Sequence, residues 1–274
     1  MSIYKRDKKV VDLSIICPGI RTENWKKLFD SILNKNFSMS MEIICIGPKP
    51  LPEDIKDARI TYIYDRGSPV RCAQIAALSA TGQRIMLLSD DGEMECGAQD
   101  KIWEVIKTQK DKTVVLGKYT EGEGSSKQGR KNWVFQLADK YYRAHTFALS
   151  DPNLVPDWST ANFAYIDRSY FIELGGWDCR FEGNALSIMD WANRAQRDGT
   201  LFYLADIKVF SVSLDLGPSH SPLKDAFYLN DLPLYQSIYN DHDCVNRIKI
   251  DINNWKNSPE MWPRRIQNGV YISG

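Results

Sequence analysis

The first half of the chain alternates short apolar runs with segments that carry apolar residues at helical spacing. Five runs predict strands: VVDLSIIC (10–17), MEIICIG (41–47), ARITYIY (58–64), RIMLLS (84–89) and TVVLGKY (113–119). The first is typical of a parallel strand that is buried on both faces. Segments 22–33, 70–80 and 98–108 predict helices, because their apolar residues recur three or four positions apart. Strands and helices that alternate in this way form βαβ units. We therefore expect an α/β fold on a mainly parallel sheet flanked by helices.

A ligand-facing rim follows from this order of elements. The carboxyl ends of parallel strands meet at one edge of a sheet, and ligands bind beyond that edge. Pro18, Gly47, Asp65 and Asp90 each stand at the end of a predicted strand. We expect these four residues to lie on one rim.

The second half of the sequence is less regular. Residues 120–132 are rich in Gly, Ser and charge and predict a mobile loop, and an amphipathic helix is expected over 133–148. Further segments predict a strand over 161–166, helices over 167–174, 185–199 and 225–239, and one or two strands over 201–213. No repeat or linker interrupts the chain, so we expect a sheet domain over 1–205 and a C-terminal extension over 206–274 packed on it.

Charge and cysteine content narrow the class of protein. Lys plus Arg and Asp plus Glu both number 35, and the net charge of zero disfavours binding to nucleic acid or membranes through bulk positive charge. No run reaches the ~20 apolar residues of a membrane span, and the start of the chain lacks the apolar stretch of a signal peptide. Six scattered cysteines form no CxxC pair. These features predict a reduced, soluble, cytoplasmic protein.

Ser89, Asp90 and Asp91 follow directly on a buried strand. Two adjacent carboxylates repel each other unless a cation lies beside them. Mg²⁺ and Mn²⁺ prefer oxygen ligands, commonly one or two carboxylates together with substrate phosphates. The alternative is that Asp-Asp-Gly only makes a turn.

Three further positions could carry chemistry. Asp190 follows a Gly-Gly-Trp-Asp segment and either faces a site or forms a surface (i, i+4) ion pair with Arg194. Arg71 falls in the first turn of a helix that Ser68 and Pro69 begin, where the helix dipole disfavours a cation. Either Arg71 binds an anionic phosphate at this helix N-terminus, or it is a surface arginine. His220, in a Gly/Pro/Ser loop, is a metal ligand, a phosphate contact or a surface residue.

The motifs of several other enzyme classes are absent from the sequence. No GxGxxG follows the first strand, and there is no GxxxxGK[ST], GxSxG or HExxH. Rossmann dehydrogenases, P-loop enzymes, α/β-hydrolases and zincins therefore fit poorly.

In order and spacing, these segments resemble the GT-A (Rossmann-like) glycosyltransferases of the family 2 type. The resemblance covers about residues 11–200. It rests on five segments: LSIICPGIR (13–21), RCAQ (71–74), ATGQRIMLLSDDGEM (80–94), ELGGWDCRFEG (173–183) and IMDWANRAQRDG (188–199).

The resemblance implies a role for each matching position. Asp91 would bind a divalent metal, Mn²⁺ or Mg²⁺, on the diphosphate of a nucleotide-sugar donor, with His220 as a further ligand. Asp190 would be the catalytic base. The donor would contact Pro18, Arg21, Asp65, Arg71, Gln74, Ser89 and Asp90, and the acceptor would contact Trp158, Asn162, Trp177 and Asp178.

The sequence departs from the family pattern at three places. Ser89 stands where the family has its first acid, and Ser187 and Ile188 stand where many members have a Glu-Asp pair that supplies the base. The second strand ends in Cys45-Ile46-Gly47 rather than in an acid that reads the nucleobase. Donor base and catalytic competence are therefore left open by the sequence.

The expected reaction is inverting, metal-assisted transfer from a nucleoside-diphosphate sugar, a UDP-sugar being favoured, to an acceptor hydroxyl. The 120–132 loop, with Lys127, Arg130 and Lys131, would close over the diphosphate. Two alternatives are a nucleotidyltransferase that makes sugar nucleotides and a non-catalytic nucleotide or glycan binder. The acceptor could be a glycan, a lipid-linked sugar or a hydroxymethylated DNA base, and the neutral charge leans against DNA.

Overall fold

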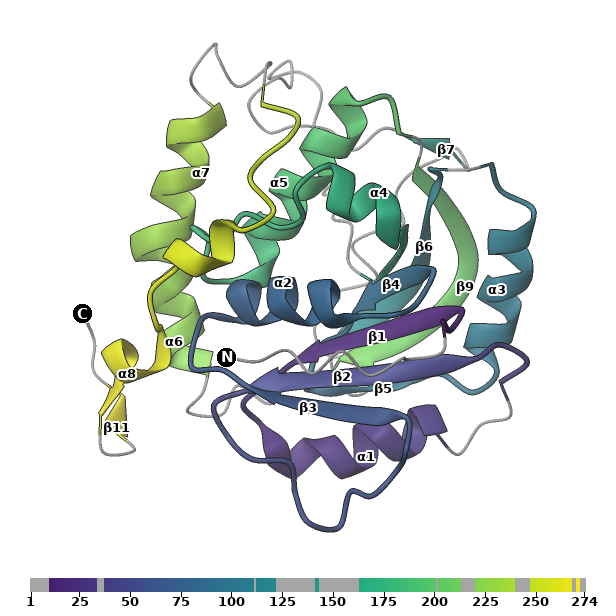
Figure 1. Ribbon diagram of the computed structural model, residues 1–274, viewed down its shortest axis with the longest axis horizontal. Helices are drawn as coiled ribbons and strands as arrows, with labels where there is room; N and C mark the ends of the chain where they lie inside the picture. The colour runs from purple at the N-terminus through teal and green to yellow at the C-terminus, as the bar shows by residue number, and fades with distance from the viewer. Residues whose placement is uncertain are drawn as a thin grey trace.

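A mixed β-sheet forms the centre of the molecule (Figure 1). The computed structural model describes residues 10–33, 37–110, 112–121, 141–142, 163–200, 202–212, 220–239, 247–267 and 270–271. One half of the sheet is parallel, in the order β3-β2-β1-β4, and consists of β1 (Leu13–Pro18), β2 (Met41–Gly47), β3 (Ile60–Tyr64) and β4 (Arg84–Leu87). The other half continues from β4 through β8 (Ala164–Asp167), β6 (Val114–Glu121), β9 (Phe202–Val212) and β5 (Gly92–Met94).

This second half makes the sheet mixed rather than mainly parallel. β8 is antiparallel to both β4 and β6, β9 is parallel to β6, and the short β5 is antiparallel to β9. β7 (Tyr141–Tyr142) also pairs antiparallel with β9. The predicted α/β class is confirmed, and the five strands expected in the first half are present.

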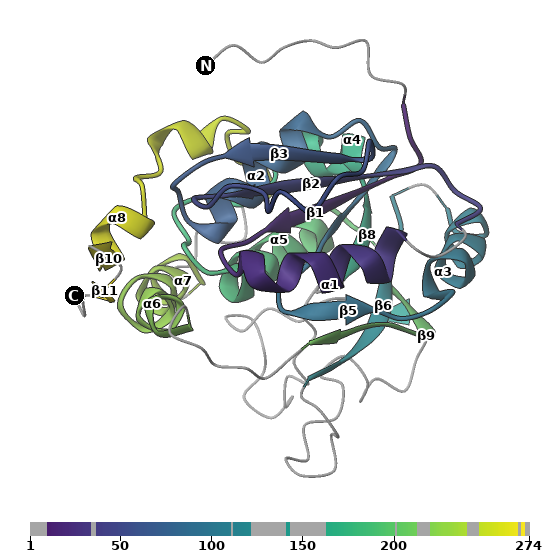
Figure 2. The ribbon, with the colours of Figure 1, turned by 90° about the horizontal axis from the view of Figure 1, so that it is seen from below.

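Helices cover both faces of the sheet (Figures 1 and 2). α2 (Pro69–Ser79) packs on β1 and β2, α1 (Thr22–Leu33) packs against β5, and α3 (Ala98–Lys107) packs against β6 and β9. α4 (Arg168–Glu173) adjoins β8, and α5 (Asn184–Arg197) contacts α2.

The buried side chains explain why these segments fold as they do. Every residue of β1 and β2 is buried, as expected for central parallel strands. The helical spacing of α1 places Trp25, Leu28, Phe29 and Ile32 in the core. Ser68 caps α2 by accepting a hydrogen bond from the backbone N–H of Arg71, which confirms the predicted helix start.

Chain segments after β9 gather at the carboxyl ends of β1 to β3 (Figures 1 and 2). Residues 220–239 form α6 (His220–Asp225), the π-helix η1 (Ala226–Asp231) and α7 (Leu232–Tyr239). The tail contains η3 (Asn254–Asn257), α8 (Trp262–Arg265) and the hairpin β10 (Ile266–Gln267) and β11 (Val270–Tyr271). Arg264 and Arg265 form ion pairs with Glu182, which fix the tail beside the start of α5.

Three expectations from the sequence need correction. Tyr141 and Tyr142 form a strand, whereas a helix was expected over 133–148. Thr120 and Glu121 belong to β6, and the rest of the expected 120–132 loop lies outside the described residues. β9 runs through the expected domain boundary at 205/206: it pairs with β6 on both sides of that point, with a register shift between Leu204 and Lys208. Among the described helices, none combines the length and apolar character needed to cross a membrane.

Candidate functional site

A pocket of about 430 Å³ opens at the carboxyl edge of the parallel strands. One side of it is formed by the ends of β1 and β2, the first turn of α2 and the three residues 89–91 after β4. The start of α5 and the helices α6 and η1 close the other side, so the C-terminal extension contributes to the wall. The lining includes Pro18, Arg21, Ser89, Asp90 and Asp91 of the predicted site, together with Gly19, Gly47, Cys72, Gly183, Asn184, Leu223, Lys224, Phe227, Tyr228 and Trp262.

Asp90 holds the loop after β1 in place. Its Oδ2 accepts hydrogen bonds from the backbone N–H groups of Ile20 (2.8 Å) and Arg21 (2.9 Å), and its Oδ1 accepts from Nε (2.8 Å) and Nη2 of the Arg21 side chain. The residue is only 3% exposed. Gly19 is required here, because a Cβ at this position would lie 2.8 Å from Asp90 Oδ2. Asp90 therefore positions the pocket wall and has little capacity for another ligand.

Asp91 is the more accessible carboxylate of this acidic pair. Its Oδ1 accepts a hydrogen bond from the Ser89 hydroxyl, and its Oδ2 lies 2.9 Å from Arg21 Nη1. Burial disfavours the charged form of Arg21, but the two carboxylates outweigh it and raise the pKa of the guanidinium. Arg21 thus stays charged between two anions, and the three side chains together carry one net negative charge.

Lys224 of α6 is the other cation of the pocket lining. It is exposed, and it makes no ion pair with any residue in the described ranges. A charged ligand entering the pocket therefore meets, on one wall, an ammonium that no described residue neutralises, and on the other wall the acidic pair with Arg21.

A divalent cation would find one suitable protein ligand here. Asp91 faces the pocket and its surroundings keep one unit of negative charge, whereas Asp90 is saturated by four N–H donors. Among the described side chains, no three His, Cys, Asp or Glu residues come together as a metal cage. The site fits a metal held by Asp91 and by oxygens of the ligand itself, which is a common mode for Mg²⁺.

Three predicted donor-binding residues, Asp65, Arg71 and Gln74, do not line this pocket, so their assignment is corrected. Arg71 Nε and Nη2 each lie 3.1 Å from a carboxylate oxygen of Asp65, and Nη1 donates to the Ser258 carbonyl. Gln74 is fully buried, where it donates to the carbonyls of Gly175 and Ile252 and accepts from the Trp177 N–H. These side chains fasten the C-terminal tail to α2 and do not line the pocket.

Asp190 is enclosed inside the protein by Arg194, Arg247 and Tyr239, and this placement does not support the predicted catalytic role. It is 0% exposed, and it lies 3.0 Å from Arg194 Nε through Oδ2. Its Oδ1 accepts from Arg247 and from the Tyr239 hydroxyl, the latter at 2.8 Å. Burial, reinforced by the nearby Asp190 charge, raises the pKa of Tyr239, which therefore remains a donor. A base must reach its proton within hydrogen-bond distance, and both oxygens of Asp190 are occupied inside the protein.

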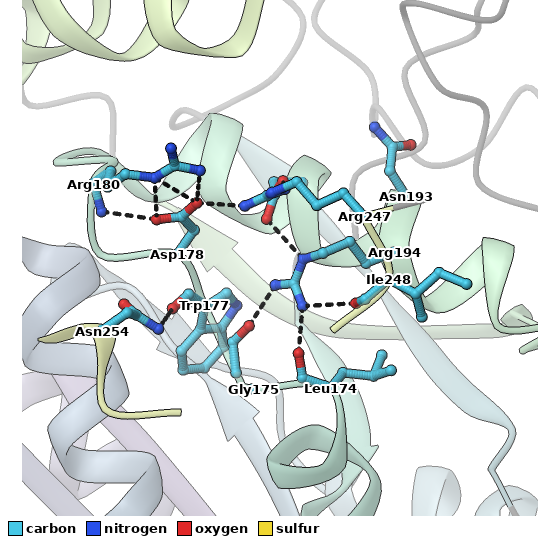
Figure 3. Close-up of polar contacts among 12 residues, drawn as sticks. Leu174, Gly175, Trp177, Asp178, Arg180, Asn193, Arg194, Arg247, Ile248 and Asn254 are labelled. Atoms are coloured by element: carbon cyan, nitrogen blue, oxygen red, sulfur yellow. Dashed lines mark hydrogen bonds and ion pairs between the residues drawn. The ribbon is translucent and has the colours of Figure 1, made fainter. Parts of the chain in front are cut away.

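The predicted acceptor residues Trp177 and Asp178 belong to the same buried region (Figure 3). Asp178 pairs with Arg180 and Arg247. Burial favours its neutral form, but the hydrogen bonds from Arg180 and the charges of both arginines prevail and lower the pKa of Asp178. Trp177 is 2% exposed and stacks edge-on against Phe171 at 4.5 Å between ring centroids. Neither side chain is available to an acceptor, which corrects that expectation.

The remaining predicted residues are only partly placed. Trp158, Asn162, Lys127, Arg130 and Lys131 lie outside the described residues. His220 begins α6, one turn before Leu223 and Lys224 of the pocket lining, and its side chain is outside the described ones.

No pattern in the sequence predicts the pocket wall that the C-terminal extension forms. Lys224, Phe227 and Tyr228 recur at helical spacing on α6 and η1, but nothing in that spacing names the surface they face. Gly19 was discoverable in principle, since a glycine directly after a strand end often marks a close approach of backbone to another group.

No protein-family model matches the sequence, and no curated protein matches it. Solved structures of S. aureus TarS do match. The TarS 1–349 complex with UDP aligns at 11% identity and a TM-score of 0.57 over 89% of this chain and 68% of that one. The complex with UDP-GlcNAc aligns at 13% identity and 0.55 over 89% and 72%. A longer TarS structure aligns at 12% identity and 0.56, with 41% of its length covered. At such identities the match establishes a shared fold.

Proposed function

We propose that this chain is a glycosyltransferase that takes its sugar from a nucleoside-diphosphate sugar. The observation that carries the proposal is the acidic pair Asp90 and Asp91, which lies in a pocket between the ends of β1 and β2 and the starts of α2 and α5. Helix N-termini attract phosphate groups. The TarS structures with UDP and with UDP-GlcNAc have the same fold, which supports a nucleotide sugar, and a UDP-sugar in particular, as the ligand.

Asp91 would hold a Mn²⁺ or Mg²⁺ ion together with the donor phosphates. Such an ion, when bound, would neutralise the leaving diphosphate. Lys224 would stabilise the same charge from the opposite wall of the pocket. We propose an inverting displacement, in which the acceptor oxygen attacks the anomeric carbon as the bond to the diphosphate breaks. The nucleoside diphosphate leaves with the bonding electrons, and the hydroxyl proton passes to solvent water.

A second candidate function is a nucleotide-sugar binder that does not transfer the sugar. It is favoured by the burial of Asp190 and by Ser187 and Ile188 at the family's Glu-Asp position. Within the described pocket lining, Asp90 and Asp91 are the only acids, and both are committed to other contacts. Binding without turnover would distinguish this candidate from an enzyme.

Thermal unfolding with UDP tests the proposed site. Wild-type protein with Mn²⁺ and UDP at a hundredfold its Kd is expected to gain about 2.7 kcal/mol of stability. We expect EDTA or Asp91→Asn to remove that gain, because Asp91 is the one pocket carboxylate able to face the ion.

Asp54→Asn is the matched control, since Asp54 is an exposed acid outside this pocket, and it should behave as wild type. A wild type unaffected by any nucleoside diphosphate would rule out the proposed function. A UDP shift without release of UDP from UDP-sugars, tested with candidate acceptors, would favour the binder.

Substitution of Lys224 by glutamine should weaken UDP binding by about tenfold. A charge-assisted hydrogen bond contributes about 1.5–3 kcal/mol, and about 1.4 kcal/mol corresponds to a factor of ten. Calorimetric titration would measure the Kd values for UDP and for uridine, and the uridine value should not change. Lys101→Gln on the exposed side of α3 is the control. Equal losses for UDP and uridine would contradict a phosphate contact.

A further inference from the structure

The side chain of Arg21 bridges both members of the acidic pair. Its Nε (2.8 Å) and Nη2 bind Oδ1 of Asp90, and its Nη1 lies 2.9 Å from Oδ2 of Asp91. The backbone N–H of Arg21 is also fixed, at 2.9 Å from Asp90 Oδ2. Arg21 is therefore anchored to Asp90 at several atoms and joined to Asp91 by one ion pair.

These contacts place Arg21 in competition with any cation at Asp91. A guanidinium and a divalent ion seek the same carboxylate oxygens, and Oδ1 of Asp91 is already occupied by the Ser89 hydroxyl. The Arg21 side chain is only 13% exposed, so the competing charges act on one another with little screening by water. A metal alone must displace the Nη1 contact and then leaves that N–H group without an anionic partner.

We propose that Arg21 makes metal binding at Asp91 depend on the donor diphosphate. Without a donor, Nη1 neutralises Asp91 and the metal binds weakly. A diphosphate offers oxygen ligands to the metal and an anionic partner to the Nη1 released from Asp91, while Nε and Nη2 remain on Asp90. Metal and donor then bind as a coupled pair, and each raises the affinity of the other by the same factor. This inference rests on the proposed function and adds to it a coupling between metal and donor binding.

Mn²⁺ binding followed by the electron paramagnetic resonance signal of the free ion tests the coupling. For the wild type, we expect UDP to tighten Mn²⁺ binding by about tenfold or more. For Arg21→Met, which keeps the aliphatic stem and removes the charge, Mn²⁺ alone should bind about tenfold tighter than to the wild type, and the effect of UDP should shrink. Asp91→Asn added to Arg21→Met should abolish Mn²⁺ binding, which would place the ion at Asp91.

Arg21→Lys is the second variant, because Asp90 is buried and Arg21→Met could unfold. Its ammonium keeps the charge beside Asp90 but cannot span both carboxylates, so Mn²⁺ alone should again bind more tightly than to the wild type. The inference is wrong if Mn²⁺ alone binds equally to the wild type and to the folded Arg21 variants, or if the full UDP effect persists in them. Either result, with UDP still binding to the wild type, would leave the proposed function intact, whereas failure of the wild type to bind UDP would overturn both.

Discussion

Asp190→Asn is expected to lower the free energy of unfolding by about 3–5 kcal/mol, the range measured when one partner of a buried ion pair is removed. The carboxylate is fully buried and binds Arg194 at 3.0 Å, Arg247 and Tyr239. Asparagine keeps the shape but leaves the buried Arg194 without its counter-charge, and Arg247 then has only Asp178 as an anionic partner. Urea unfolding followed by tryptophan fluorescence would measure the loss.

Asp30→Asn is the matched control for this prediction. Asp30 also forms an (i, i+4) pair at 3.0 Å, with Lys26, but both side chains are about half exposed. Its removal should cost less than about 0.5 kcal/mol, because water screens such pairs. If Asp190→Asn instead unfolds like the wild type and loses only turnover, with UDP affinity unchanged, Asp190 is the catalytic base after all.

The two interpretations of Asp190 show which of its contacts can be predicted from the sequence. Asp190 and Arg194 do form an ion pair, but it is fully buried, whereas the expected alternative was a surface pair. Their (i, i+4) spacing indicates the pair itself. It does not indicate burial, because Arg247 and Tyr239, which complete the cluster, come from segments far along the chain. Long-range partners of this kind leave no periodic signal in one sequence.

The pocket, too, is predictable from the sequence where local features form it and unpredictable where distant segments meet. Strand ends are local features, so the sequence predicts that Pro18, Gly47 and Asp90 share a rim, and all three line the pocket. Asp65 also stands at a strand end, but Arg71 holds it and the tail packs over them through Ser258. The path of that tail depends on tertiary contacts such as those of Glu182 with Arg264 and Arg265, which no local pattern predicts.

Gly47→Ala is expected to reduce stability by about 3 kcal/mol, near the upper end for overpacking, and to weaken UDP binding by more than tenfold. A Cβ at Gly47 would lie 2.0 Å from the carbonyl oxygen of Gly19. This oxygen cannot rotate away as a flexible side chain would, because the Gly19 N–H is bonded to the Ile46 carbonyl at 2.9 Å. The loop that carries Arg21 must therefore shift, and its contacts with Asp90 shift with it.

Gly97→Ala is the control that separates the loss of stability from the loss of UDP affinity. Gly97 has a positive φ of 67° but nothing within 4 Å of an added Cβ, so alanine there should cost about 1–2 kcal/mol through backbone strain alone. It lies outside the pocket and should leave the Kd for UDP unchanged. Calorimetric titration with UDP, at a temperature where both variants are folded, would compare their Kd values with that of the wild type. If Gly47→Ala loses stability but binds UDP like the wild type, the close contact between Gly47 and Gly19 stabilises the fold but does not position the donor site.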